Sequence, residues 1–336
     1  MMLGWIIGLT AKFRTLALGS LLATTTACGQ DEAGIDPIEL SISPVQLNSE
    51  DPRQEQVARL IWRGGLEITS DDDRFGGFSG LLASADGTEL LAVSDRGRWF
   101  SARVSYGADG HLAGLSDGKI APLRDLDGEV LDKKKWRDAE SLATFEDGTK
   151  LVSFEGKHRI WLYGSTAEAL DAKPTAWPQP PGIDDIPKNS GLEALVALQN
   201  KGLLVFVQDQ VDRPNGKAFL WREDRWSQLT YERQEKFRPK GATRLPGGDI
   251  LVLESARLDS KELVTRLVRV AASDIRPRAH LRSIELARLE PPLSVHNFEG
   301  IASREGSNGE TLIYLLSDND FDEDHRTLLV MFELED

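Results

Sequence analysis

Residues 138–155 read DAESLATFEDGTKLVSFE, and this stretch decides the fold. A short opening motif at 138–142 precedes the pair Asp147-Gly148, and the apolar run at 151–154 ends in an acidic residue, Glu155. Glycine supplies the positive φ of a tight hairpin turn, and the apolar residues on both sides favour buried strands. The stretch therefore predicts a β-hairpin with carboxylates at its open end.

The same pattern occurs five times in the chain. The copies begin at Gly77, Asp138, Gly191, Pro239 and Asn297, and a candidate third strand follows each of them. Copies about 50–60 residues apart, each with up to four strands, are typical of β-propeller blades. We therefore predict an all-β propeller of five four-stranded blades, or of six if another blade lies between the fourth and fifth copies or is assembled from both ends of the chain.

An apolar segment at residues 60–68 precedes the first copy and has no partner upstream. We expect it to pair with residues 327–332 in the last blade, because closing the ring removes exposed sheet edges. The propeller domain would then span residues 57–336. A polar tether at 28–56, with one short strand candidate at 38–42, would precede it.

Residues 1–27 are typical of an export signal of the lipoprotein type. Lys12 and Arg14 precede an uncharged stretch at 16–27, and Cys28, the only cysteine of the chain, follows directly. The sequence at 25–28 resembles a bacterial lipoprotein box. It predicts a lipid on Cys28 that anchors the protein in the cell envelope, facing the periplasm at the outer membrane. Ordinary signal cleavage near Ala27 is the alternative.

The chain is strongly acidic, with a formal net charge of -14. This balance speaks against nucleic acid as a partner, because phosphate binding requires a concentrated basic surface. It favours a cation, or a small anionic substrate that a metal cation bridges to the protein.

The repeat predicts a gathering of carboxylates at one mouth of the propeller channel. The first strand of a blade lines the channel and the second runs antiparallel beside it, so the start of the first and the end of the second lie at the same mouth. The second strands end in Asp95, Glu155, Asp209, Glu254 and Asp318. The first strands begin with Glu140, Glu193 and Glu299, with Ser79 and Lys240 in the other two copies.

Carboxylates that converge on one mouth repel each other unless something compensates their charge. A hard cation such as Ca²⁺, shared protons or nearby basic side chains would each do so. We expect the second-strand acids to be metal ligands and the first-strand glutamates to be catalytic. Candidate anion-binding residues are Arg96, Arg159, Lys240 and His296. An acid after a strand also commonly accepts backbone N–H bonds in a turn, which is the alternative for any single residue.

The chain resembles the bacterial family called "esterase-like activity of phytase". The matching segments read SDRG, DAE, HRIW, GLEAL, LPGGD, NFEGIA, SD and RTLL, at residues 94–97, 138–140, 158–161, 191–195, 245–249, 297–302, 317–318 and 326–329. They cover nearly the whole predicted domain. The resemblance implies a propeller fold, an exported bacterial protein and hydrolase activity.

Two functions follow from the predicted acidic mouth. The first is a metal-dependent hydrolase of phosphate or carboxylic esters, in which Ca²⁺ binds at the mouth and helps to activate water or polarise the ester. The second is a non-catalytic envelope propeller that binds a ligand or a protein partner. The two differ in whether an ester is turned over.

Overall fold

The computed structural model describes Met1 and residues 34–165, 170–188, 190–208, 215–234, 236–257 and 262–335. The export signal at 1–27, Cys28 and the candidate ligand Asp209 lie outside the described residues. All strands belong to one compact unit, Ala33–Asp336. Among the described residues, no helix is long and apolar enough to cross a membrane.

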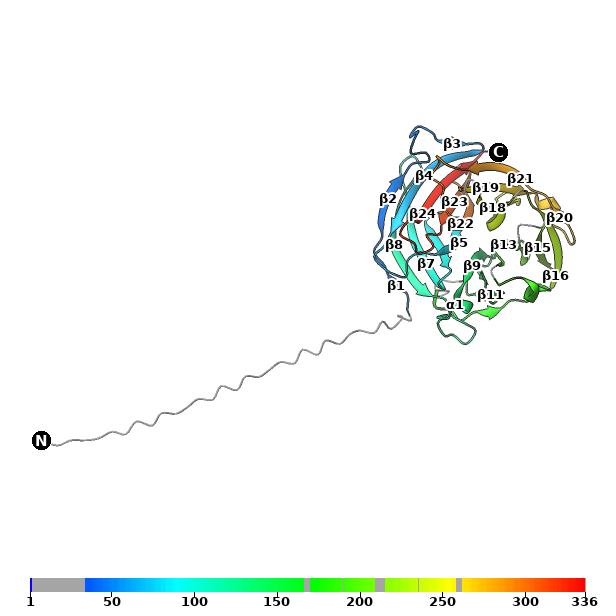
Figure 1. Ribbon diagram of the computed structural model, residues 1–336, viewed down its shortest axis with the longest axis horizontal. Coiled ribbons are helices and arrows are strands. Elements are labelled where there is room, and N and C mark those ends of the chain that lie inside the picture. The colour runs from blue at the N-terminus through cyan, green and yellow to red at the C-terminus, as the bar shows by residue number, and fades with distance from the viewer. Residues whose placement is uncertain are drawn as a thin grey trace. The chain divides into compact units, whose positions relative to one another are not determined.

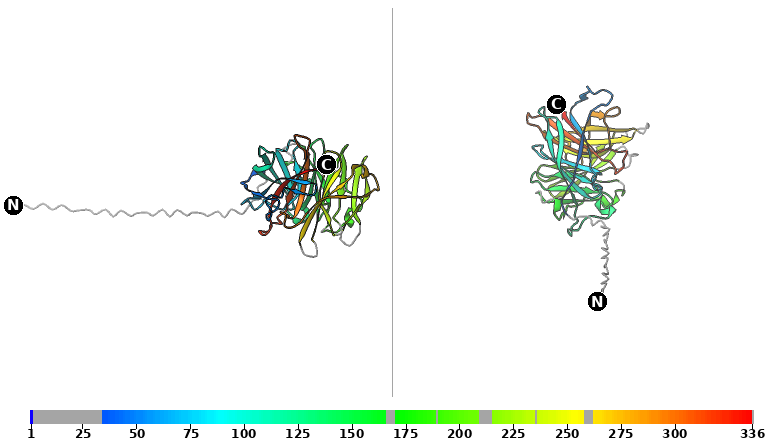
Figure 2. Two further views of the ribbon diagram at one scale, coloured as in Figure 1. Left: turned by 90° about the horizontal axis from the view of Figure 1, so that it is seen from above. Right: turned by 90° about the vertical axis from the view of Figure 1, so that its left-hand side faces the viewer.

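The strands form five separate sheets arranged as a ring, which Figure 1 shows in face view and Figure 2 from two sides. Blade 1 contains β5 (Phe78–Ala83), β6 (Glu89–Ser94), β7 (Arg98–Tyr106) and β8 (Leu112–Pro122). Blade 2 contains β9 (Ala139–Thr144), β10 (Lys150–Phe154), β11 (Arg159–Tyr163) and β12 (Thr175–Ala176). Blade 3 contains β13 (Ala194–Leu198), β14 (Gly202–Phe206), β15 (Asn215–Arg222) and β16 (Arg225–Glu232). Blade 4 contains β17 (Arg238–Arg244), β18 (Ile250–Arg257), β19 (Leu263–Val270) and β21 (Ile284–Leu289).

The fifth blade closes the ring with strands from both ends of the chain. It contains β22 (Phe298–Glu305), β23 (Thr311–Ser317), β24 (Leu328–Leu334) and β4 (Leu60–Thr69). Strand β24 pairs antiparallel with β4, so the predicted closure is confirmed. The interval between the fourth and fifth copies holds no sixth blade among its described residues. It supplies β21 to blade 4 and β20 (His280–Leu281), which pairs in parallel with β16.

The described part of the expected tether is folded onto the outer edges of the ring. Strand β1 (Asp36–Pro37) pairs with β8, whereas β2 (Ser41–Val45) and β3 (Gln56–Val57) pair with β4. These short strands cover backbone groups that an open sheet edge would expose. Only the strand candidate at 38–42 indicated this in the sequence, because the alternation of apolar residues there is short.

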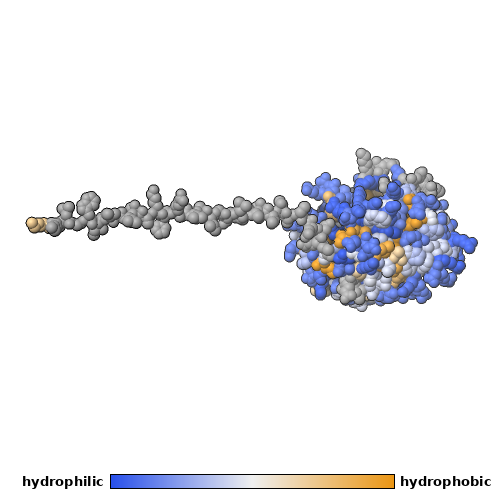
Figure 3. Space-filling model, turned by 90° about the horizontal axis from the view of Figure 1, so that it is seen from below, coloured by the Kyte–Doolittle hydropathy of each residue, from blue (hydrophilic) through white to orange (hydrophobic). Residues whose placement is uncertain are grey.

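Apolar side chains fill the space between neighbouring blades. Trp99 of blade 1 meets Tyr163 of blade 2 edge to face, with ring centroids 5.2 Å apart. Phe206 and Tyr231 form a similar pair 5.0 Å apart inside blade 3. The side of the domain drawn in Figure 3 is mostly hydrophilic with scattered apolar patches, in keeping with a core between the sheets.

Small residues near the start of each inner strand let the five inner strands approach one another. Gly80, Gly241 and Gly300 occupy this position in three blades, with Ser141 and Ala194 in the other two. A Cβ on Gly241 would lie 2.4 Å from the backbone oxygen of the next blade's Glu299, and a Cβ on Gly80 would lie 2.7 Å from a backbone nitrogen of the inner strand of blade 2. Close approach of backbones is a common reason for glycine in a strand.

Remaining short elements lie in the connections. They are α1 (Lys134–Arg137) before blade 2, and the 3-10 turns η2 (Ile183–Asp185) and η3 (Ala272–Asp274).

Candidate functional site

A β-bulge at the start of the inner strand selects one side chain in each of four blades. The pairing of the first two strands skips Ser79, Glu140, Lys240 and Glu299. In blade 3 the corresponding residue is Glu193, which lies just before β13 and is bracketed by the hydrogen bond from Gln208 N to Gly191 O. A bulge places two residues of one strand opposite one residue of its partner and redirects a side chain. The sequence pattern had pointed to these five residues.

A second set of side chains follows the end of the second strand. In three blades its backbone N–H donates to a residue just before the inner strand: Asp95 to Gly77, Glu155 to Asp138 and Asp318 to Asn297, at 2.8–2.9 Å. In blade 3 the equivalent donor is Gln208. The predicted ligand Asp209 is therefore one position beyond the equivalent residue, in addition to lying outside the described part of the chain.

Glu254 does not join this set. It pairs with Pro239 inside the sheet, and it is Ser255 that pairs with Arg238 at the position equivalent to Glu155. Because neighbouring strand residues point to opposite faces, this difference of one residue sends the Glu254 carboxylate into the blade. There it accepts hydrogen bonds from Arg266 Nε at 2.6 Å and from Tyr231 Oη at 2.9 Å, and it is fully buried.

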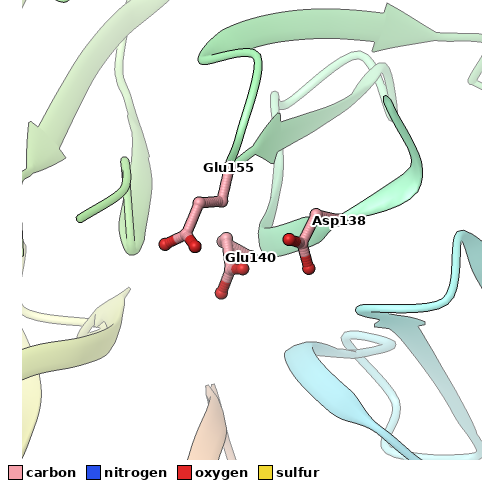
Figure 4. Close-up of side chains that lie close together, drawn as sticks. All are labelled: Asp138, Glu140 and Glu155. Atoms are coloured by element: carbon pink, nitrogen blue, oxygen red, sulfur yellow. The ribbon is translucent and has the colours of Figure 1, made fainter. Parts of the chain in front are cut away.

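The acids of blade 2 form the densest group in the described part of the chain. Asp138, Glu140 and Glu155 each offer a carboxylate oxygen, and these oxygens all lie within 4.8 Å of one another. Figure 4 shows the three side chains side by side, with Asp138 and Glu140 from the start of β9 and Glu155 just after β10. Sequence analysis missed Asp138, although its place opposite Glu155 in the hairpin could have revealed it.

Lys240 pairs with the other two first-strand glutamates and offsets one of their two charges. Its Nζ lies 2.7 Å from an oxygen of Glu299 and 3.7 Å from an oxygen of Glu193. Both glutamates are less than a tenth exposed. These contacts join blades 3, 4 and 5 at the channel and raise the pKa of Lys240, so the ammonium stays charged.

The blade 2 acids have no such partner. Among the described residues, none of Asp138, Glu140 and Glu155 forms an ion pair. Burial raises the pKa of Glu155 to about 8, and the nearby Glu193 and Asp138 add to this. Burial and then the charges of Glu193 and Glu299 hold the pKa of Glu140 well above its usual range. The pKa of Asp138 is also raised by burial, against the opposing charges of Lys134 and Arg137.

Asp95 and Asp318 extend the acidic group toward blades 1 and 5. Burial and the charge of Asp138 raise the pKa of Asp95 to about 6. Burial and the charge of Glu299 raise the pKa of Asp318. The Oδ1 atom of Asp95 is buried and accepts no hydrogen bond from the described residues. It lies 2.2 Å from where a Cβ on Gly77 would be, at φ +66°, so only glycine fits beneath it.

Among the described residues, three of the four expected anion-binding side chains form no ion pair with the acids of the mouth. Arg159 is buried, donates to the backbone oxygens of Lys157 and Trp136, and stacks 3.8 Å from the ring of Phe154. Exposed Arg96 lies over the ring of Phe321, 3.2 Å from its centroid.

His296 lies beside the ion pair between Glu67 and Arg326. Burial and the charge of Arg326 lower the pKa of the His296 imidazole. Of the four expected anion-binding residues, Lys240 is thus the one that ion-pairs with the acids of the mouth.

Two cavities mark the ends of the channel. At the far ends of the inner strands, a cavity of about 470 Å³ is lined mainly by apolar residues of all five blades, with Glu146 among the few charged ones. Beside Lys240, a cavity of about 390 Å³ is lined by blade 4 and its neighbours. The clustered carboxylates and Lys240 therefore lie at the mouth where the inner strands begin.

Comparison with protein-family models agrees with this architecture. The model described as "Phytase-like: Esterase-like activity of phytase" matches residues 73–321, which include blades 1–4 and strands β22 and β23 of the fifth blade. The chain belongs to this family. Membership in the phytase-like family suggests a hydrolase-type propeller. A search of curated proteins found no match.

Solved structures similar to this phytase-like chain are distant in sequence. A putative gluconolactonase is 12% identical, with a TM-score of 0.45 over 91% of this chain and 96% of its own. A protein of unknown function from Dyadobacter fermentans is 11% identical, with a TM-score of 0.45 over 90% and 94%. A gluconolactonase from Xanthomonas campestris is 10% identical, with a TM-score of 0.39 over 90% and 98%.

Replacing Glu254 should destabilise the phytase-like domain far more than replacing Glu155. Glu254→Ala removes the buried carboxylate 2.6 Å from the Arg266 guanidinium and leaves only the more exposed Glu285, at 3.4 Å. Breaking a buried ion pair typically lowers the free energy of unfolding by about 3–5 kcal/mol. Glu155→Ala removes a repelled carboxylate and should change that free energy little or raise it. Urea unfolding of both variants measures the difference, and the opposite order would contradict the assignment of the two residues.

Without a bound cation, the domain should lose stability as the pH rises. A carboxyl whose folded pKa is raised keeps a proton that the unfolded chain has released, so its stabilising effect is complete at acid pH and declines as the pH rises through the folded pKa, about 8 for Glu155. The melting temperature of metal-stripped protein should fall from about pH 5 to about pH 8. Glu155→Gln should show a shallower fall, and equal slopes would count against the raised pKa.

Proposed function

We propose that this phytase-like propeller is an exported hydrolase that cleaves phosphate or carboxylic esters, with Ca²⁺ bound at its acidic mouth. The observation that carries the proposal is the group formed by Asp138, Glu140 and Glu155, which each offer an oxygen within 4.8 Å of the others and form no ion pair with a described cation. Repulsion inside such a group costs free energy unless protons or a metal ion relieve it.

The donors fit Ca²⁺ better than a softer metal. All three are carboxylates, and hard cations prefer oxygen ligands, of which Ca²⁺ takes 6–8. Three carboxylates supply up to six oxygens, and the unpartnered oxygen of Asp95 lies on the neighbouring blade. Neither cysteine nor histidine belongs to the group. A divalent ion there would polarise the ester and stabilise the negative charge that develops on it.

Lys240 supplies a fixed positive charge beside the metal ligands. Glu193 and Glu299 hold its ammonium from two neighbouring blades, at 3.7 and 2.7 Å. A cation positioned before the reaction stabilises developing negative charge at little reorganisation cost. In this proposal Glu140 is a metal ligand, and Glu193 and Glu299 position Lys240 rather than react with the substrate.

Export and anchoring are part of the same proposal. The signal-like residues 1–27 and the single cysteine, Cys28, support a lipid-anchored protein of the cell envelope, facing the periplasm at the outer membrane. An extracytoplasmic position also fits a calcium site of modest affinity, because extracellular modules commonly bind Ca²⁺ more weakly than cytosolic buffers do.

Purified protein should hydrolyse p-nitrophenyl phosphate or p-nitrophenyl acetate with Ca²⁺, and removal of the metal should abolish the activity. Glu140→Gln should lower activity by at least about 100-fold, since residues that merely support metal ligands already contribute about 10–100-fold. Glu146→Gln is the matched control, because this exposed glutamate lies at the opposite end of the same hairpin and should leave activity unchanged.

Turnover of neither ester would contradict the proposal. Calcium binding without turnover would instead support the non-catalytic propeller that binds a ligand.

A further inference from the structure

Blade 4 reverses the charge pattern that the other blades share. Its bulge residue is Lys240, where three blades have glutamate. On its second strand, Ser255 occupies the position that Asp95, Glu155 and Asp318 occupy in other blades. The residue that pairs with Ser255 is Arg238. Blade 4 therefore has a lysine and a serine at two positions where most other blades have acids, and an arginine at the position of Asp138.

These residues line the cavity of about 390 Å³ beside the mouth. Its basic side chains are Lys236, Arg238, Lys240 and Arg257, and Gln208 and Ser255 add neutral hydrogen-bonding groups. No described carboxylate lines it. In a chain with a net charge of -14, a concave site whose charged lining residues are all basic is a marked local exception.

The two arginines of this pocket form no ion pair with a described carboxylate. Arg238 donates a long hydrogen bond, 3.5 Å, to Oε1 of Gln208, which is itself neutral. Arg257 is exposed at the end of β18, and neither arginine forms an ion pair within the described part of the chain. Arginine presents several N–H donors in a plane that matches the oxygens of phosphate or carboxylate groups.

Lys240 connects the pocket to the acidic group. It lines the pocket, and it contacts Glu193 and Glu299 on its other side. The charge of Glu140 also acts on Lys240 and contributes to its raised pKa. Lys240 thus belongs both to the lining of the pocket and to the charged group of the mouth.

We propose that the blade 4 pocket binds an oxyanion group, phosphate or carboxylate, through Arg238 and Arg257. Its role as a substrate subsite rests on the proposed function: the ester would carry a second, non-reacting anionic group that binds here while its scissile bond lies at the acids. Binding of the anion itself requires neither calcium nor turnover. The substrate class is then a small ester with at least two negatively charged groups.

The test is isothermal titration calorimetry of the full chain with inorganic phosphate, and in a second arm with acetate, at constant ionic strength. Metal is removed beforehand on a chelating resin, because a soluble chelator would itself compete as an anion. The double variant R238A/R257A should weaken phosphate binding at least about tenfold, as loss of hydrogen bonds to a charged group does. Should that variant not fold, Arg257→Glu alone, at an exposed position, should have the same effect.

The charge-matched control is R53A/R276A. Both arginines are exposed, Arg53 in the segment before β3 and Arg276 after η3. This control should bind phosphate like the unmodified protein. Binding of phosphate but not acetate would identify a phosphoryl group, and binding of both would identify oxyanions in general. No phosphate binding, or equal loss in both double variants, would overturn the proposal.

Ester hydrolysis assays distinguish a failure of the anion-binding pocket from a failure of the proposed hydrolase function. If the protein is a hydrolase, R238A/R257A should retain activity on a singly charged ester and lose activity on a doubly charged one. That result would show that the pocket is a substrate subsite. Phosphate binding that depends on the two arginines in a protein without any esterase activity would leave the pocket standing and reject the hydrolase.

Discussion

Electrostatic repulsion among carboxylates at one channel mouth is the constraint on which the rest of this structure's chemistry depends. The propeller ring brings the start of every inner strand to the same place, and in four blades a bulge there turns one side chain out of the regular alternation. Charges on distant parts of the chain thereby become neighbours. A soluble domain can hold them together only by neutralising them, by protonating them or by binding a cation.

The structure partly compensates one half of this mouth and leaves the other half acidic. Lys240 in blade 4 lies between Glu193 and Glu299, so its ammonium offsets one of their two negative charges. Blade 2 contributes three carboxylates within 4.8 Å and has no comparable cation. The boundary between the two halves is where a ligand with separated charges would fit, since cationic and metal-binding groups then act on opposite ends of it.

The sequence predicted what depends on repetition and failed where one residue of register matters. The Gly-containing turns and apolar runs identified the blades, and the unpaired segment at 60–68 identified the closing strand β4. The bulge residues followed from the same alignment of copies. Glu254 looked like Glu155 because both end an apolar run, yet only the strand pairing shows that Ser255 is the equivalent residue.

Packing explains why other candidates moved away from the site. Arg159 lies among aromatic rings of blade 2, and nothing in its sequence neighbourhood distinguishes a stacked arginine from one that faces a ligand. Asp138 and Arg238 were overlooked for the converse reason. Asp138 lies just before its inner strand and Arg238 is the first residue of its own, and each becomes important only through its partner on the second strand.

Proton release on calcium binding tests the central claim most directly. If the blade 2 carboxyls hold protons at neutral pH because their charges are otherwise uncompensated, Ca²⁺ must displace those protons when it binds. Calorimetric titrations of metal-stripped protein with Ca²⁺, in two buffers of different ionisation enthalpy, should give binding heats that differ by the heat of protonating the buffer. Saturable binding with identical heats in both buffers, or no binding at all, would contradict the account.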